Sequence, residues 1–347
     1  MRLSPEGYET LKDRPVDLDE PWSSHELSRL SRWTLETGGP IVGVPAAQDG
    51  TLYVGSRDAS VYALDPAEST VFWSRPLRKL ADIETGLTIH GTKIFLGAND
   101  QRVYALDRET GDIAWSTPVT GFVKHAPVVD GGRVLVATSK GFVASLDASH
   151  GRVIWSTRIG GHVVGSALVT EREVRVVNSE GAYVTLASRT GEILSRRDLE
   201  TRVLSVAFTG SSLILGTDSG EIRCVDAHSG EAVWTHACRR PVRSTATIHE
   251  GAAYIGADDG VLRKLDLATG DLLASYRTRG MLRGQPLVYE GRVFAGGTDR
   301  FLYCLDAAGL DLVWRGRCEG SISSSPFEAY GAIYVGSADH RLYCFEP

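Results

Sequence analysis

Residues 105–115 read ALDRETGDIAW, and close variants of this stretch return along almost the whole chain. Two of them are ALDPAESTVFW at 63–73 and SLDASHGRVIW at 145–155. A stretch that returns every 20–50 residues is the signature of a repeat architecture, and a fold prediction that overlooks the repeat will be wrong. The interval between the copies therefore decides the fold class.

The acidic residue of this motif marks the repeat. It stands at Asp65, Asp107, Asp147, Asp226, Asp266 and Asp306, and Ala187 and Glu346 fill the two remaining places. The successive intervals are 42, 40, 40, 39, 40, 40 and 40 residues, which makes eight units. Within each unit, short apolar runs bounded by Gly and Asp are typical of strands joined by hairpins. Four strands every 40 residues predict one propeller blade per unit.

A tryptophan follows the acidic position by eight residues in most units. These residues are Trp73, Trp115, Trp155, Trp234 and Trp314, while Ser195 and Ala274 replace it in units four and six. Because Trp33 lies 40 residues before Trp73, we expect its strand to complete the last blade and close the ring, which removes open sheet edges. We interpret all six tryptophans as blade-docking residues, since a flat apolar ring with one N–H suits a position between blades.

The predicted fold is therefore all-β. We expect a single eight-bladed β-propeller with four-stranded antiparallel blades over residues 32–347, closed by an N-terminal strand, after an extension at 1–31. Trp22 in this extension is expected to anchor it on the propeller or on a partner, with the propeller favoured.

The pattern A-x-D-x-x-T-G-x-x-x-W resembles the tryptophan-docking motif of the PQQ-like (quinoprotein alcohol dehydrogenase-like) β-propeller family. The residues that carry the likeness most fully are Ala105, Asp107, Thr110, Gly111 and Trp115. The resemblance implies eight blades, with each tryptophan between neighbouring blades. The family includes quinone-dependent dehydrogenases and non-enzymatic members, among them the propeller lipoprotein of the outer-membrane β-barrel assembly machinery.

Several features favour a non-enzymatic member. The chain lacks the paired cysteines and long insertions of the dehydrogenases, and it has no nucleophile-elbow or phosphate-loop motif. We therefore expect no cofactor, no metal and no catalytic residue, and predict a protein-interaction scaffold or sensor. Two alternatives stay open, namely a propeller that binds a small anion or quinone-like ligand, and an unrecognised PQQ-dependent oxidoreductase.

Composition narrows the class of partner. The net charge of -6 argues against a nucleic-acid partner, because proteins that bind nucleic acids are usually basic. No apolar stretch is long enough to span a membrane, and the N-terminal residues show neither a secretory signal nor a lipidation cysteine. We therefore expect a cytoplasmic bacterial protein, and the residues give no indication of its oligomeric state.

Basic residues concentrate in the segments that lead from one unit into the next. We name the largest group the arginine arc, and it comprises Arg196, Arg197, Arg202, Arg239, Arg240, Arg243, Arg277, Arg279 and Arg283. A focused basic patch can attract an acidic partner even on an acidic protein, although arginine stems can also simply cover strand edges. A second candidate site, at the mouth of the central channel, comprises Glu84, Lys124, Arg243 and Arg283, where we expect room for a small anion.

Overall fold

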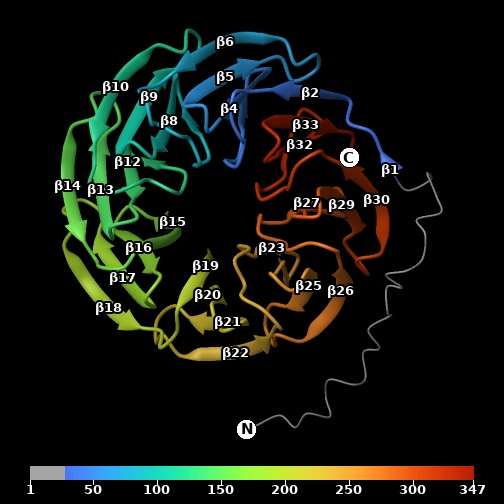
Figure 1. Ribbon diagram of the computed structural model, residues 1–347. Coiled ribbons are helices and arrows are strands. Elements are labelled where there is room, and N and C mark those ends of the chain that lie inside the picture. Colours follow the sequence, from blue (N-terminus) through green and yellow to red (C-terminus); the bar gives the residue numbers. More distant parts are fainter. Residues whose placement is uncertain (1–27) are drawn as a thin grey trace.

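Eight antiparallel sheets stand side by side around a central axis in the computed structural model, which describes residues 28–347 (Figure 1). The first four blades, in chain order, are built as follows. Blade 1 holds β3 (Ala46–Gln48), β4 (Thr51–Gly55), β5 (Ser60–Leu64) and β6 (Val71–Pro76); blade 2 holds β7 (Thr88–His90), β8 (Lys93–Ala98), β9 (Arg102–Asp107) and β10 (Ile113–Pro118); blade 3 holds β11 (Val128–Asp130), β12 (Arg133–Ala137), β13 (Phe142–Asp147) and β14 (Val153–Arg158); blade 4 holds β15 (Val163–Val169), β16 (Glu173–Asn178), β17 (Ala182–Ala187) and β18 (Ile193–Asp198).

The remaining blades repeat this order from the axis outward. Blade 5 holds β19 (Val203–Phe208), β20 (Ser212–Thr217), β21 (Glu221–Asp226) and β22 (Ala232–Ala237); blade 6 holds β23 (Thr247–His249), β24 (Ala252–Ile255), β25 (Val261–Asp266) and β26 (Leu272–Arg277); blade 7 holds β27 (Leu287–Tyr289), β28 (Arg292–Gly296), β29 (Phe301–Asp306) and β30 (Leu312–Arg317); blade 8 holds β31 (Phe327–Ala329), β32 (Ala332–Gly336), β33 (Arg341–Phe345) and β2 (Trp33–Glu36). The predicted fold class is confirmed.

The N-terminal strand closes the ring as the spacing of the tryptophans predicted. Strand β2 pairs antiparallel with β33, with Trp33 opposite Cys344 and Glu36 opposite Arg341. Figure 1 shows this pairing as blue β2 beside red β33. A further short strand, β1 (Ser28–Arg29), runs parallel to β30 and adds a fifth strand to the outside of blade 7. Residues 1–27, including Trp22 and most of the predicted extension, lie outside the described residues.

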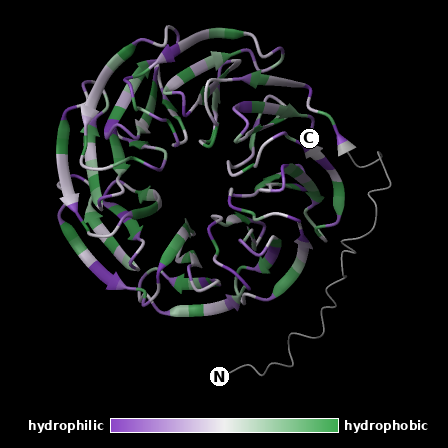
Figure 2. Cartoon of the chain, in the orientation of Figure 1, coloured by the Kyte–Doolittle hydropathy of each residue, from purple (hydrophilic) through white to green (hydrophobic). Residues whose placement is uncertain are grey.

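The hydrophobic core lies between the blades and not at the axis. Each cluster of buried side chains combines two neighbouring sheets: Tyr53 of blade 1 joins Leu96 of blade 2, for example, and Phe95 of blade 2 joins Val134 of blade 3. Figure 2 shows hydrophobic residues along the strands of every blade and hydrophilic ones in many of the connections. Stability therefore depends on eight junctions between blades, each of which needs side chains from both sides.

Two further properties of the described chain bear on its class. Within residues 28–347, no helix is long and apolar enough to cross a membrane. The five cysteines are free thiols, four of them buried and Cys238 partly so.

Candidate functional site

The repeated motif builds the outer part of each junction. The carboxylate of Asp107 accepts the backbone N–H groups of Glu109 and Thr110, both at 2.9 Å, and so shapes the turn that faces the preceding blade. Trp73 of that preceding blade donates its indole N–H to the Arg108 carbonyl at 3.3 Å. Its ring lies against Gly111, where an added Cβ would come within 2.6 Å of the indole. The aspartate, the glycine and the tryptophan of the motif thus each have a structural role at the junction.

The same arrangement returns at three more of the predicted tryptophans. The indole N–H of Trp115 reaches Ala148 O at 3.0 Å, that of Trp155 reaches Ser188 O at 3.1 Å, and that of Trp234 reaches Leu267 O at 3.0 Å. Trp33 of the closing strand likewise donates to Pro66 O at 3.1 Å. Glycines in the facing turns again lie against the rings of Trp115, Trp155 and Trp234.

Trp314 differs from the other five tryptophans. Its indole N–H has no hydrogen-bond partner among residues 28–347. The guanidinium of Arg29 lies over its ring, 5.0 Å from the centroid, and donates to the carbonyls of Glu346 and Pro347 at 3.0 and 2.9 Å. At this junction an arginine of the short strand β1 covers the tryptophan from outside.

Two junctions lack the tryptophan, and other side chains fill its place. Where Ser195 replaces it, the stem of Arg197 lies against Gly230, with Cδ 3.2 Å from the position of an added Cβ. Where Ala274 replaces it, Leu310 stands in the facing turn and is buried, with 2% of its surface exposed. The Lys264 ammonium there donates to the Ala307 carbonyl at 2.8 Å, as the indole does elsewhere.

One face of the ring carries both the connections between blades and the hairpins that join the two middle strands of each blade. A backbone hydrogen bond ties each connection to the hairpin beside it, as from Arg57 N–H to Pro40 O at 3.0 Å and from Asp258 N–H to Pro241 O at 3.0 Å. Equivalent bonds occur in the other six blades. The arginine arc and the channel-mouth residues belong to these connections or to the strand ends beside them, so we name this surface the connection face.

Hairpin aspartates of four blades hold the connection face together. In each case one carboxylate oxygen accepts an N–H of the hairpin, and the other accepts an N–H of the connection twenty residues earlier. Asp58, for example, accepts from Ser60 at 2.8 Å and from Gly38 at 2.7 Å, and Asp299 accepts from Arg279 at 3.0 Å. The other two members are Asp259 and Asp339. These carboxylates are structural acceptors.

The arginine arc is organised around the hairpin of blade 6. The Asp258 carboxylate, 9% exposed, pairs with Arg243 at 3.1 Å and with Arg283 at 3.0 Å. The neighbouring Asp259 pairs with Arg263 at 2.6 Å. Burial by itself raises the pKa of Asp259, but the hydrogen bond and charge of Arg263 outweigh burial, so this pKa lies below its ordinary value. The structure therefore brings the middle of the arc together on a buried carboxylate pair.

The other members of the arc lie at different depths. Arg202 and Arg240 are exposed in the connections before blades 5 and 6. Arg277 on β26 donates to the backbone carbonyl of Asp259 at 3.3 Å, which keeps it close to the blade 6 hairpin. Arg196 and Arg197 stand on the outer strand β18, where Arg196 donates to Ile159 O at 2.9 Å. These two arginines are thus used at the outer junction of blade 4.

The channel-mouth residues form two separate ionic groups. Lys124 pairs with Glu84 at 2.5 Å, and Arg57 approaches the same carboxylate at 3.4 Å. Burial raises the pKa of Glu84, but the hydrogen bond and charge of Lys124, then a hydrogen bond from Asn99 and the charge of Arg57, outweigh burial and hold this pKa below its usual range. Arg243 and Arg283 share Asp258 in a different part of the ring. Each of these predicted cations therefore already faces a carboxylate of this chain.

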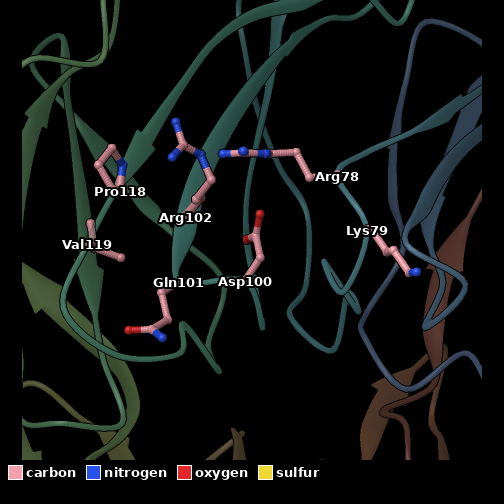
Figure 3. Close-up of a pocket in the computed structure, with 7 residues that line it drawn as sticks. All are labelled: Arg78, Lys79, Asp100, Gln101, Arg102, Pro118 and Val119. Atoms are coloured by element: carbon pink, nitrogen blue, oxygen red, sulfur yellow. The ribbon is translucent and has the colours of Figure 1, made fainter.

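Sequence reasoning missed a pocket on the connection face. It has a volume of about 410 Å³ and lies between the connection before blade 2 and the hairpin of that blade (Figure 3). Its lining includes Arg78, Lys79, Asp100, Arg102, Pro118 and Val119. The signal in the sequence was the first repeat interval, which is 42 residues instead of 39 or 40.

The described residues do not fit a quinone centre with its calcium ion. Within residues 28–347, no group of three His, Cys, Asp or Glu side chains could hold a metal ion. Four hairpin aspartates of the connection face, Asp58, Asp259, Asp299 and Asp339, already accept backbone N–H groups. No step of a quinone reaction is therefore assigned to this chain.

Comparison with known proteins agrees with this architecture. A family model described as outer membrane protein assembly factor BamB matches residues 22–121, 117–194, 180–287 and 277–347. Among solved structures, BamB from Moraxella catarrhalis is similar at a TM-score of 0.78 and 17% identity, covering 91% of this chain and 99% of that one. A search of curated proteins found no match.

Two further solved structures show how widely this fold is used. A computationally designed protein, Ika8, is similar at a TM-score of 0.80 and 16% identity, covering 92% of this chain and all of that one (100%). Quinohemoprotein alcohol dehydrogenase from Comamonas testosteroni is similar at 0.74 and 14% identity, covering 92% of this chain and 76% of the enzyme. At such identities the likeness shows the fold alone.

Proposed function

This chain belongs to the family of PQQ-like propeller repeats described as outer membrane protein assembly factor BamB, and from that premise we propose that it is a non-catalytic protein-interaction scaffold. Its partner is a protein with an acidic segment, and the docking surface is the arginine arc on the connection face. The name of the family supports a role in assembly, and the charge of this face supports the choice of surface.

The observation that carries the proposal is the imbalance of charge around blade 6. Arg239, Arg240, Arg243, Arg263, Arg277, Arg279 and Arg283 come together in adjacent connections and strand ends. Three hairpin carboxylates lie among these seven cations, namely Asp258 and Asp259 of blade 6 and Asp299 of blade 7, so the cations outnumber the carboxylates. The remaining positive charge lies on a rigid surface, because backbone hydrogen bonds fix each connection to its hairpin.

Guanidinium groups are suited to such docking. They bind carboxylates through two parallel hydrogen bonds and stay charged at every physiological pH. Complementary charge also speeds the encounter of two proteins more than it strengthens the final complex. We therefore expect association that weakens markedly as salt concentration rises.

The test compares two charge reversals on opposite faces. The first variant, Arg202→Glu with Arg240→Glu, changes exposed arginines of the arc. The control, Arg152→Glu with Arg172→Glu, changes two exposed arginines on the opposite face by the same total charge. Immobilised wild type and both variants are incubated with bacterial lysate, and bound proteins are quantified by mass spectrometry.

We expect the arc variant to lose a defined set of bound proteins that the control variant retains, and those proteins should contain acidic segments. Recombinant versions of the leading candidates should then bind wild type with an association rate that falls at higher salt. Equal retention of every bound protein by the two variants would refute the arc as the docking surface.

A further inference from the structure

The short strand β1 is an addition to a blade that already has its four strands. Blade 7 is complete with β27, β28, β29 and β30, and β2 closes the ring by pairing with β33. Strand β1 lies outside β30, with Ser28 opposite Arg315 and Arg29 opposite Gly316 (Figure 1). It runs parallel to β30, whereas β29 and β30 are antiparallel. The outer edge of blade 7 therefore accepts a strand that ring closure does not need.

The side chain of Arg29 contacts one aromatic ring and two backbone carbonyls. Its guanidinium lies 5.0 Å from the centroid of Trp314, and Nη1 donates to Glu346 O at 3.0 Å and to Pro347 O at 2.9 Å. A guanidinium is attracted to the face of an indole and can donate to carbonyl oxygens at the same time. We name this group, the Trp314 ring with Glu346 O and Pro347 O, the Arg29 site.

One acceptor of the Arg29 site corresponds to the acceptor of the indole N–H at other junctions. Trp115 donates to Ala148 O, 33 residues later, and the same interval occurs at three other junctions. Pro347 stands at this interval from Trp314. Its carbonyl accepts from Arg29, however, and the Trp314 N–H has no partner within the described part of the chain. A donor from outside the repeat therefore takes the place that the indole has elsewhere.

The contact of β1 with blade 7 is small. Within the described residues, β1 pairs with two of the six residues of β30. Leu30, which follows β1, is 90% exposed, and Val313 on β30 is 36% exposed. A contact of this size can open locally while the rest of the domain stays folded. A longer strand can pair along the whole of β30 and so gain backbone hydrogen bonds that β1 lacks.

We propose that the outer edge of β30 and the Arg29 site together bind an extended segment of a partner protein that carries an arginine. Ser28 and Arg29 occupy this site in cis, so the partner must displace them. The partner segment pairs with β30, and its arginine takes the place of Arg29 on Trp314. The inference goes beyond the proposed function and does not depend on it, because it concerns the outer wall of blade 7 and not the connection face.

The chemistry of the site selects this occupant. An acidic side chain would be repelled by the carbonyl oxygens and by the Glu346 carboxylate, which is 62% exposed. A lysine can donate to a carbonyl, but it lacks the planar group that stacks on the indole. A second copy of this chain offers the same strand that each copy already binds in cis, so exchange between copies gains no new contact. A separate partner with a longer strand does gain contacts.

The experiment uses a model strand, a blocked and fluorescein-labelled peptide of residues 24–31, SHELSRLS. Fluorescence anisotropy measures its binding to the full chain as wild type, as Arg29→Ala and as the control Arg32→Ala. The control removes a nearby arginine that approaches the Glu346 carboxylate at 3.9 Å. Two further peptides carry Ala or Lys in place of the arginine. Hydrogen exchange followed by mass spectrometry locates the bound peptide, and thermal unfolding shows whether each variant is folded.

We expect Arg29→Ala to bind the arginine peptide about tenfold more tightly than wild type, because the site is no longer filled in cis. Arg32→Ala should bind it as wild type does. The alanine peptide should bind Arg29→Ala about tenfold more weakly than the arginine peptide, and the lysine peptide should lie between them. The bound peptide should slow exchange in β30 and leave exchange in β14 unchanged. Arg29→Ala should unfold cooperatively, because β2 still closes the ring.

Four binding results would overturn the proposal: no binding to Arg29→Ala at millimolar peptide, equal affinity of wild type and Arg29→Ala, equal affinity of the arginine and alanine peptides, or protection outside β30. An Arg29→Ala chain that fails to fold would show that Arg29 is part of ring closure and cannot be displaced. Wild-type dimers that are lost in Arg29→Ala would assign the site to a second copy and reject a separate partner.

Discussion

The junction between blades 2 and 3 and the junction between blades 6 and 7 solve one packing problem in opposite ways. In the first, the large Trp115 ring of one blade lies on Gly151 of the next, and the ring is 9% exposed. In the second, the small Ala274 faces Leu310, which is 2% exposed. The large residue comes from the outer strand in one case and from the facing turn in the other.

The two junctions show that the space between neighbouring blades must be filled by side chains, but that no particular residue is required to fill it. Protein interiors are close-packed, so a smaller side chain on one blade must be matched by a larger one on its neighbour. Leu310 accepts an unfavourable φ of 60° at a place where four of the tryptophan-bearing junctions have glycine. The glycine of the repeated motif therefore provides room for the indole as well as freedom for the turn.

The largest effect should come from removing a tryptophan. Trp115→Ala takes away a buried ring and the donor to Ala148 O, so the free energy of unfolding should fall by about 3–5 kcal/mol. Ile154→Ala on the next outer strand is the control, because its side chain is 49% exposed and its loss should cost less than about 1 kcal/mol. Urea unfolding followed by circular dichroism measures both. Similar values for the two variants would contradict the structural role of the indole.

Glycine substitutions should separate room from backbone strain. Gly50 and Gly151 have similar left-handed conformations, with φ of 76° and 73°. A Cβ on Gly50 would meet nothing within 4 Å, whereas one on Gly151 would approach Trp115 Cε3 at 2.5 Å. We expect Gly50→Ala to cost about 1 kcal/mol from strain alone and Gly151→Ala about 3 kcal/mol from strain and overpacking. Equal losses in thermal unfolding would mean that the ring moves aside freely.

The sequence was sufficient for the ring because its repeat obeys a simple rule. Seven intervals of nearly constant length between eight units predicted eight blades, and the 40-residue distance from Trp33 to Trp73 predicted the closing strand. The exchange of volume between Ala274 and Leu310 could not be predicted, since spacing alone does not show which residues face each other across a junction. Arg197 illustrates the same limit, because its sequence neighbours suggest an exposed rim while its stem lies against Gly230.

The blade 2 pocket was partly predictable, less so than the ring of blades but more so than the exchange of volume between Ala274 and Leu310. The 42-residue interval showed that two residues had been added, but the same change could have lengthened a hairpin or a turn on either face. Whether the addition opens a pocket depends on three-dimensional contact, which spacing alone does not show. The arginine arc was visible as composition, whereas its pairing on Asp258 was not.

A double-mutant cycle tests the exchange of volume directly. Ala274→Trp alone should overpack against Leu310, and Leu310→Gly alone should leave a cavity, each costing about 2 kcal/mol. Together they recreate the tryptophan–glycine junction, so the double variant should recover about 2 kcal/mol relative to the sum. Urea unfolding of all four proteins gives this coupling. Additive losses would show that the two positions do not share one space.

The inner side of one junction contains a contact that depends on pH. The contacts of the outer tryptophans do not, because the indole ring does not titrate. His125, before β11, accepts the Gly165 N–H of β15 through Nε2 at 3.1 Å, which requires a neutral ring. Burial lowers the pKa of His125 to about 4, and the charges of His162 and Lys124 act in the same direction. The unfolded chain, with an ordinary pKa of 6.5, binds a proton first as pH falls, so the stability present above pH 6.5 is lost on the way down to pH 4.

At pH 5.5 this loss should amount to about 1.4 kcal/mol relative to pH 8, the smallest effect considered for the junctions. The measurement is the free energy of unfolding at both pH values for wild type and for His125→Gln, whose amide oxygen can still accept the Gly165 N–H. His236, whose pKa burial also lowers, contributes equally to both proteins and cancels in the difference. A His125→Gln variant that loses as much stability as wild type between pH 8 and 5.5 would show that this junction does not respond to protons, and that the inner and outer contacts differ only in volume.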